Sequence, residues 1–166
     1  MGAKTAITVE QYLQTSFPDI DKEYWDGKIV ERSLPDNPHS ATQALLIAFF
    51  MALRKTLHTY PRPELRLKLS DGLFRIPDVS VFHPHASPEL VPTTPPLIAI
   101  EILSPDDRMT EVHAKLEEYS AWGVPHVWLV DPQSKRMYSC DPVFTHVQSL
   151  RVPELNLELT AADIFE

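Results

Sequence analysis

The spacing of apolar residues along the chain predicts strands of two kinds. At 65–69 and at 155–159, leucines alternate with other residues, a pattern typical of strands with one buried face. The runs at 97–103 and 127–130 are almost wholly apolar, which favours strands buried on both faces. Asp26-Gly27 lies between two short β-prone runs and predicts the turn of a β-hairpin.

Helices are expected between these strands. Thr8-Val9-Glu10-Gln11 has capping-box spacing, so a short helix should run to about Gln14. A long helix is expected from about 40 to 58, and another from about 110 to 122, with Gly123 as its C-terminal cap. The apolar side of the long helix is predicted to consist of Ala41, Ala44, Leu45, Ala48, Met51 and Ala52.

The order of these elements predicts an α/β fold in which helices pack on a mixed (α+β) sheet, with an N-terminal helix and β-hairpin as an extension. The strand–helix–strand unit from 98 to 130 should be a parallel crossover. The proline-rich segment 83–96 is expected to be a loop, and Tyr60–Pro63 should end the long helix. A length of 166 residues fits a single domain spanning 1–166.

The composition and the apolar runs indicate where the protein is located and what it contacts. The single cysteine, Cys140, excludes an internal disulfide, so a reducing, cytoplasmic location is expected. The longest apolar run, 44–53, is too short to span a bilayer, and the first residues lack a signal-peptide pattern, so no membrane partner is expected. Phe49-Phe50 extends that run beyond one helix stripe and hints at a dimer surface.

The net charge and the local charges of the chain lead to different expectations about nucleic-acid binding. The formal net charge of −8 argues against tight non-specific DNA binding. Residues 54–75 nevertheless hold six Lys or Arg against two Asp or Glu. The strand at 65–69 is therefore either an edge protected by charge or, as the less favoured alternative, a face that contacts phosphates.

Two isolated carboxylates and one lysine form the candidate chemistry. Asp78 follows a proline at a predicted strand start, and Glu101 lies within the apolar run at 97–103. An ionised acid in a buried strand is costly unless a cation, a metal or hydrogen bonds compensate it. Two such acids on neighbouring strands can bind Mg²⁺, while Lys115 stabilises developing charge or orients water. The set predicts metal-assisted phosphodiester hydrolysis.

Each of these residues also has a purely structural interpretation. The alternatives are a turn cap for Asp78, a salt bridge to Arg75 or Arg108 for Glu101, and a surface pair with Glu111 for Lys115.

The ordered motifs resemble the PD-(D/E)xK nuclease superfamily and, more closely, its Uma-type family of putative restriction endonucleases. The resemblance covers roughly 7–150. It rests on Ile76-Pro77-Asp78-Val79-Ser80-Val81, Glu101-Ile102-Leu103-Ser104-Pro105, Lys115-Leu116-Glu117-Glu118-Tyr119 and the run 123–132.

The resemblance implies a restriction-endonuclease-like core with Mg²⁺ or Mn²⁺ held by Asp78 and Glu101. It also implies that the catalytic lysine has moved from the strand, where Leu103 stands, to Lys115 on the following helix. Glu23 and His39 are implied to approach the site, with Glu31 and Asp26 as competitors for the role of Glu23.

These inferences favour a Mg²⁺-dependent endonuclease with DNA as its substrate, assembled as a homodimer because cutting two strands suits a two-fold assembly. One alternative is a catalytically inactive nuclease-fold module that binds and regulates another protein, as the net charge of −8 allows. Another is a metal-dependent phosphodiesterase acting on something other than duplex DNA.

Overall fold

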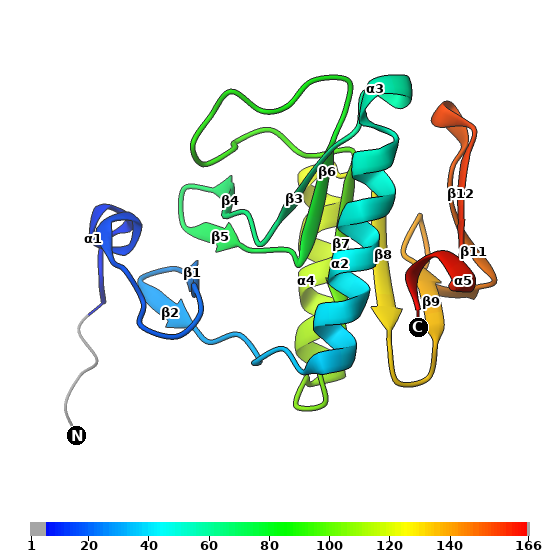
Figure 1. The fold of residues 1–166 in the computed structure, drawn as a ribbon. Coiled ribbons are helices and arrows are strands. Elements are labelled where there is room, and N and C mark those ends of the chain that lie inside the picture. The colour runs from blue at the N-terminus through cyan, green and yellow to red at the C-terminus, as the bar shows by residue number, and fades with distance from the viewer. Residues whose placement is uncertain (1–5, 166) are drawn as a thin grey trace.

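A computed structural model describes residues 6–165 (Figure 1). The helices are α1 (Val9–Gln14), α2 (Asn37–Ala52), α3 (Arg54–Leu57), α4 (Met109–Trp122), α5 (Ala161–Ile164) and the 3-10 helix η1 (Pro153–Leu155). The strands are β1 (Glu23–Trp25), β2 (Lys28–Val30), β3 (Tyr60–Pro63), β4 (Leu67–Ser70), β5 (Leu73–Arg75), β6 (Val79–Phe82), β7 (Ile98–Ile102), β8 (His126–Asp131), β9 (Arg136–Ser139), β10 (Thr145–Val147), β11 (Ser149–Val152) and β12 (Leu157–Thr160).

The largest sheet is mixed, as predicted, with the strand order β10-β9-β8-β7-β6-β3. β7 and β8 are parallel and are joined through α4, while the other neighbours in this sheet are antiparallel. A smaller sheet, β2-β1-β5-β4, lies toward the N-terminus, and β11-β12 forms a two-stranded ribbon near the C-terminus (Figure 1).

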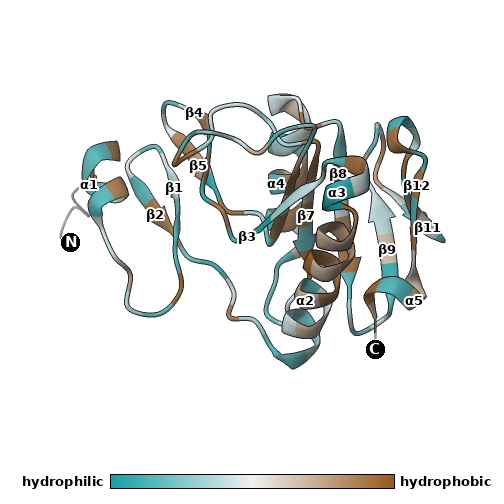
Figure 2. Cartoon of the chain, turned by 45° about the horizontal axis from the view of Figure 1, so that its top comes forward, coloured by the Kyte–Doolittle hydropathy of each residue, from teal (hydrophilic) through white to brown (hydrophobic). Residues whose placement is uncertain are grey.

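Helices cover both faces of the large sheet, which explains why β7 is apolar without alternation. Ile98 and Ile100 of β7 pack in the same core as Leu46 and Phe50 of α2. Ala99, on the opposite face of β7, packs with α4 instead. The hydrophobic colouring in Figure 2 is strongest on the central strands around β7 and along α2. A strand buried on both faces is apolar at successive positions.

A third, aromatic core fixes α1 to the small sheet. The rings of Tyr12 and Tyr24 stack with centroids 5.1 Å apart, and Phe74 of β5 meets Tyr12 edge-on at 5.4 Å. Thr8 and Gln11 form the predicted capping box at the start of α1. This core positions the β1–β2 hairpin, whose predicted turn at Asp26-Gly27 is confirmed.

The long helix differs from its prediction in bounds and in its buried face. It begins at Asn37, with Asp36 as N-cap, and ends at Ala52. Its buried side chains are His39, Thr42, Leu46 and Phe50, whereas most of the predicted apolar side is exposed. Because 44–53 is apolar all round, spacing could not decide the face, and the larger side chains fill the core. Phe50 is fully buried and therefore does not contribute to a dimer surface.

Two further segments correct the sequence-based expectations. Tyr60–Pro63 is the strand β3, not only the end of a helix, and its prolines are tolerated because β3 is the edge of the large sheet. The alternating run near 65–69 becomes a strand only from Leu67, and Leu155 lies in η1 rather than in β12.

No helix within residues 6–165 is both long and apolar enough to cross a membrane.

Candidate active site

The sheet register brings Asp78 and Glu101 together. Val79 pairs with Ile100 across β6 and β7, so Asp78, one residue before Val79, lies across from Glu101. Opposite residues of an antiparallel pair project on the same side of the sheet. Both side chains are buried, with 5% and 8% of Asp78 and Glu101 exposed.

Glu101 points at α4, where Lys115 and Tyr119 bind it. Side chains alternate along a strand, so Glu101 shares the α4 side of β7 with Ala99. Lys115 Nζ lies 3.0 Å from Glu101 Oε1, and the Tyr119 hydroxyl donates to the same oxygen at 2.7 Å. Residues four apart on a helix lie on one face, which is why both reach the strand. Lys115 therefore extends from the helix to the strand acid.

Asp78 is held by one backbone and two side-chain donors. The Ile102 N–H donates to Asp78 Oδ2 at 2.7 Å, and His39 Nε2 lies 3.3 Å from the same oxygen. Arg32 Nη2 donates to Oδ1 at 3.2 Å. His39 is placed by the start of α2, because its own N–H donates to the N-cap Asp36 at 2.9 Å. Asp78 thus connects β7, α2 and the segment before α2.

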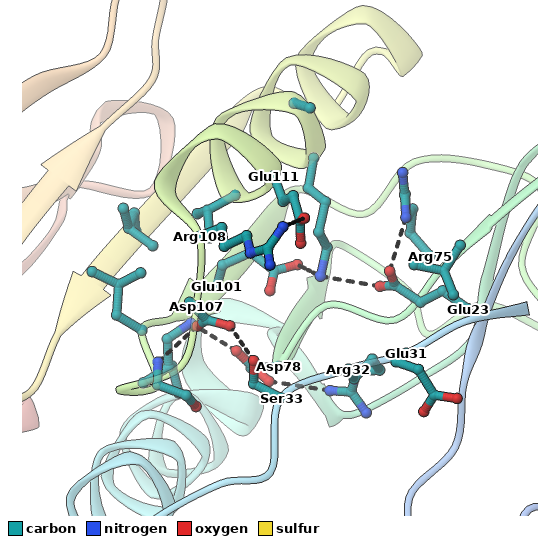
Figure 3. Close-up of a pocket in the computed structure, with 18 of the residues that line it drawn as sticks. Glu23, Glu31, Arg32, Ser33, Arg75, Asp78, Glu101, Asp107, Arg108 and Glu111 are labelled. Atoms are coloured by element: carbon teal, nitrogen blue, oxygen red, sulfur yellow. Dashed lines mark hydrogen bonds and ion pairs between the residues drawn. The ribbon is translucent and has the colours of Figure 1, made fainter.

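Glu23 of the hairpin completes the environment of the lysine. Its Oε1 lies 3.0 Å from Lys115 Nζ and accepts the Ile76 N–H at 2.9 Å. Its Oε2 accepts from Arg75 Nη1 at 2.9 Å. Arg75 also donates to Glu118 of α4 through Nε at 2.6 Å and Nη2 at 3.0 Å. The small sheet and α4 are therefore linked by ion pairs at the site (Figure 3).

The two strand acids have opposite pKa shifts. Burial alone would raise the pKa of Asp78, but His39, Arg32 and Lys115 outweigh it and hold that pKa below its ordinary value. Burial raises the pKa of Glu101 to about 7, with Asp78 and Glu23 adding to the rise while Lys115 opposes it. A buried acid with a pKa near neutrality, beside a second acid whose pKa is lowered, is the kind of perturbed pair found at functional sites.

The pKa values of His39 and Lys115 are shifted toward the charged forms of these groups. Burial would lower the pKa of His39, but the neighbouring Asp78 carboxylate more than compensates and raises it. The pKa of Lys115 is raised in the same way, because Glu101, Glu23 and Asp78 outweigh burial. Lys115 is therefore a protonated cation at neutral pH, able to stabilise negative charge but not to act as a base.

A cavity of about 400 Å³ opens onto these groups. Seven carboxylates line it, against four Lys or Arg side chains and one histidine, and Figure 3 shows them converging from the hairpin, the sheet and α4. Within residues 6–165, the polar contacts of Glu101 fall on Oε1 and leave Oε2 without a partner. An acid-rich cavity with a free carboxylate oxygen fits a divalent cation.

The donor set is the one that Mg²⁺ uses. No three His, Cys, Asp or Glu side chains among residues 6–165 form a ready metal cluster. Mg²⁺ is usually bound through one or two carboxylates, with water and substrate phosphate as the remaining ligands. Asp78 and Glu101 meet that requirement, so the residues present fit the ion.

The structure brings together all five candidate site residues: Asp78, Glu101, Lys115, Glu23 and His39. The competitors of Glu23 do not contact Lys115: Glu31 lines the cavity but pairs with Lys22, and Asp26 occupies the hairpin turn with φ 44°. The structural alternatives for Glu101 and Lys115 are wrong: Arg75 binds Glu23 and Glu118, Arg108 takes Glu111 as its partner, and Lys115 lies against Glu101 and Glu23. Catalytic roles for the five stay predictions.

Three site residues were missed from the sequence: Arg32, Arg75 as a partner of Glu23, and Tyr119. Arg75 had a detectable signal, because a lone cation in the run Leu73–Ile76 is as anomalous as an acid in an apolar strand. Tyr119 follows Lys115 by one helical turn. Arg32 lies in irregular chain and has no such signal.

Three of the six cations in the basic segment 54–75 are paired with carboxylates within the fold. Arg66 pairs with Asp21, Lys68 Nζ lies 2.9 Å from Asp71 Oδ1, and Arg75 is bound to two glutamates. β4 forms the edge of the small sheet, as the protected-edge interpretation predicts. These pairs weaken the alternative of a phosphate-contacting face.

The mixed sheet and its acid–acid–lysine site define a nuclease-like protein. A family model described as a putative restriction endonuclease, Uma2, matches residues 9–166, and the chain belongs to this family. Among solved structures, the chain is similar to a putative nuclease of DUF820 from Anabaena variabilis. The two share 26% identity with a TM-score of 0.78, over 95% of this chain and 97% of that chain. Among proteins of curated function, none matches. The core is restriction-endonuclease-like, as the resemblance implied.

Proposed function

We propose that this protein is a Mg²⁺-dependent endonuclease that hydrolyses phosphodiester bonds of DNA. The observation that carries the proposal is the contact of Lys115 Nζ with Glu101 Oε1 at 3.0 Å, beside Asp78 on the neighbouring strand. Two buried acids and a partly buried lysine converge on one cavity. Family membership and the similar solved structure support the same reaction class.

Asp78 and Glu101 would hold the ion. When bound there, Mg²⁺ polarises the scissile phosphate and lowers the pKa of the attacking water. Lys115 supplies positive charge where the phosphorane-like transition state accumulates negative charge. Glu23 and Tyr119 fix the ammonium and the Glu101 carboxylate, respectively, so these groups need little reorganisation during the reaction.

Metal binding and cleavage test the proposal separately. Mn²⁺ titration by calorimetry should show binding to the wild type and none to the Asp78→Ala, Glu101→Ala double variant. Glu31→Gln is the matched control, because Glu31 lines the same cavity but is paired with Lys22. Incubation of linear DNA with Mg²⁺ should then give cleavage by the wild type and the control only. Equal metal binding by all three proteins would refute the metal site.

A non-catalytic nuclease-fold module is the second candidate. The observation in its favour is that Arg32 and His39 already neutralise Asp78 without a metal. Such a protein would bind and regulate a protein partner. It predicts no rise in melting temperature with Mg²⁺, whereas a working site gives a rise through linkage.

The setting that matches the endonuclease proposal is a single-domain chain in a reducing cytoplasm, assembled as a homodimer. Two sites related by two-fold symmetry would cut both strands of a duplex. Sedimentation of the wild type at two concentrations measures this assembly directly.

A further inference from the structure

The β1–β2 hairpin turns one face to a core and the other to the cavity. Tyr24 and Ile29 are paired across the hairpin and lie in the aromatic core. Because side chains alternate along strands, Glu23 and Trp25 share the opposite face of β1. The same cavity that holds Glu101 and Lys115 is lined by both Glu23 and Trp25. The residue that contacts the lysine and this tryptophan are therefore presented together.

Trp25 is unusual among the aromatic residues of this region because it is not packed away. Its side chain is 51% exposed, whereas Tyr24 beside it is 5% exposed. Lys28, its cross-strand partner, holds its ammonium 5.6 Å from the Trp25 ring centroid. An indole at the rim of a site with a cation beside it can stack a nucleobase and contact the adjoining phosphate.

The depth of the acids limits which nucleic acid reaches them. Asp78 and Glu101 are 5% and 8% exposed, inside a cavity of about 400 Å³. Intact duplex DNA carries its phosphates on a wide, stiff rod whose bases are already stacked on one another. An unpaired strand can bend a single phosphate inward and offer the free face of its base to a side chain.

We infer that Trp25, with Lys28 beside it, forms a stacking site for a nucleobase, and that the substrate of the active site is single-stranded or locally unpaired DNA rather than intact duplex. This inference rests on the proposed endonuclease function and narrows its substrate class to DNA with unpaired nucleotides, so a two-fold assembly that cuts both strands of an intact duplex is not part of it. Trp25 acts in binding and has no part in the bond-breaking step.

Fluorescence anisotropy of a labelled 15-nucleotide strand tests the inference. The strand is compared with its blunt duplex and with a duplex carrying three unpaired nucleotides, with Ca²⁺ in place of Mg²⁺. The wild type should bind the strand and the interrupted duplex at least about 10-fold more tightly than the blunt duplex. Trp25→Ala should weaken strand binding about 5- to 150-fold, the range for one lost base stack. Trp25→Phe should stay within about 3-fold of the wild type, because phenylalanine also stacks bases.

Leu90→Ala is the control, because Leu90 is 95% exposed and lies outside the cavity lining. A second readout is tryptophan emission, which the strand should quench in the wild type but not in Trp25→Phe, where Trp122 and Trp128 remain. Equal binding of strand and blunt duplex overturns the inference. So does equal strand affinity of Trp25→Ala and the wild type, or an equal loss in Trp25→Phe and Trp25→Ala.

Cleavage of the same three DNAs in Mg²⁺ separates this inference from the proposed function. Rapid cutting of blunt duplex that is unaffected by Trp25→Ala would support the endonuclease and overturn the substrate inference. Strand binding that depends on Trp25, without cleavage of any of the three, would support the stacking site and contradict the endonuclease.

Discussion

The helices α2 and α4 lie on opposite faces of β7, but they contribute different things. α2 buries Leu46 and Phe50, and its contacts with the site are His39, beside the Asp78 carboxylate, and Gln43, whose Nε2 donates to the Asp78 carbonyl at 2.9 Å. α4 is more polar, and its buried face, with Val112, Leu116 and Tyr119, also carries Lys115. A helix that is apolar all round mainly supplies packing. A polar helix that turns a lysine and a tyrosine hydroxyl inward supplies chemistry, since burying such groups is costly.

The largest effect on stability is expected from a substitution in α2. Phe50→Ala should lower the free energy of unfolding by about 3–5 kcal/mol, because Phe50 is fully buried and its ring stacks on that of Trp128. Urea denaturation measures the loss. Met51→Ala, at a 45% exposed neighbour, should change the free energy by less than about 1 kcal/mol. Similar losses in both variants would mean that the buried face of α2 is wrongly assigned.

In α4, Lys115→Met should slow DNA cleavage by about 10²- to 10³-fold while destabilising the protein less than Phe50→Ala does. Loss of a single electrostatic group in a site has an effect of this size, and methionine retains the volume of the side chain. Single-turnover cleavage and urea denaturation give the two numbers. Lys55→Met, on exposed α3, is the control. Cleavage by Lys115→Met within about 3-fold of the wild type would contradict the assigned role.

The pKa of Glu101 predicts a pH effect on stability in metal-free buffer. Because its folded-state pKa of about 7 lies above its ordinary value of 4.5, folding favours the protonated form. This group should therefore reduce stability as pH rises from about 4.5 to 7. Glu101→Gln removes this pH-dependent loss of stability. The free energy of unfolding of the variant minus that of the wild type should therefore increase by about 1–3 kcal/mol from pH 5 to pH 8. A pH-independent difference would show that burial does not raise the pKa of Glu101 in the folded protein.

The smallest effect concerns the cations on Asp78. Arg32→Gln should tighten Mn²⁺ binding about 3- to 10-fold, because it removes a positive charge 3.2 Å from the Asp78 carboxylate. Calorimetry checks this, with Arg151→Gln in the distant β11 strand as the control. Weaker Mn²⁺ binding by Arg32→Gln would indicate that Arg32 mainly orients Asp78, which would make it a partner of the metal site and not a competitor.

The sequence was most informative where a local signal determined the structure. The capping box at Thr8, the Asp26-Gly27 turn and the Gly123 cap, with its φ of 105°, depend only on near neighbours, and each is found in the structure. The acids were predicted because a charge in an apolar strand requires a partner. The face of α2 was mistaken because an all-apolar helix has no distinct stripe.

Long-range partners were the part that the sequence could not supply. Arg32 meets Asp78 across 46 residues of chain, and Arg75 meets Glu118 across 43. Neither pairing follows from spacing, because it depends on how the small sheet docks against α4. The same holds for the choice between Glu23, Glu31 and Asp26, which only the hairpin's orientation decides.

The ion pairs of Arg75 with Glu23 and Glu118 have a consequence for the order in which the site forms during synthesis of the chain. Glu23 is translated early, but its partners Arg75 and Lys115 emerge much later, and Glu118 must be in place on α4 to hold Arg75. A nascent chain therefore cannot assemble the lysine environment until the ribosome has passed α4. The proposed endonuclease activity would therefore be absent from copies of the chain that end before α4.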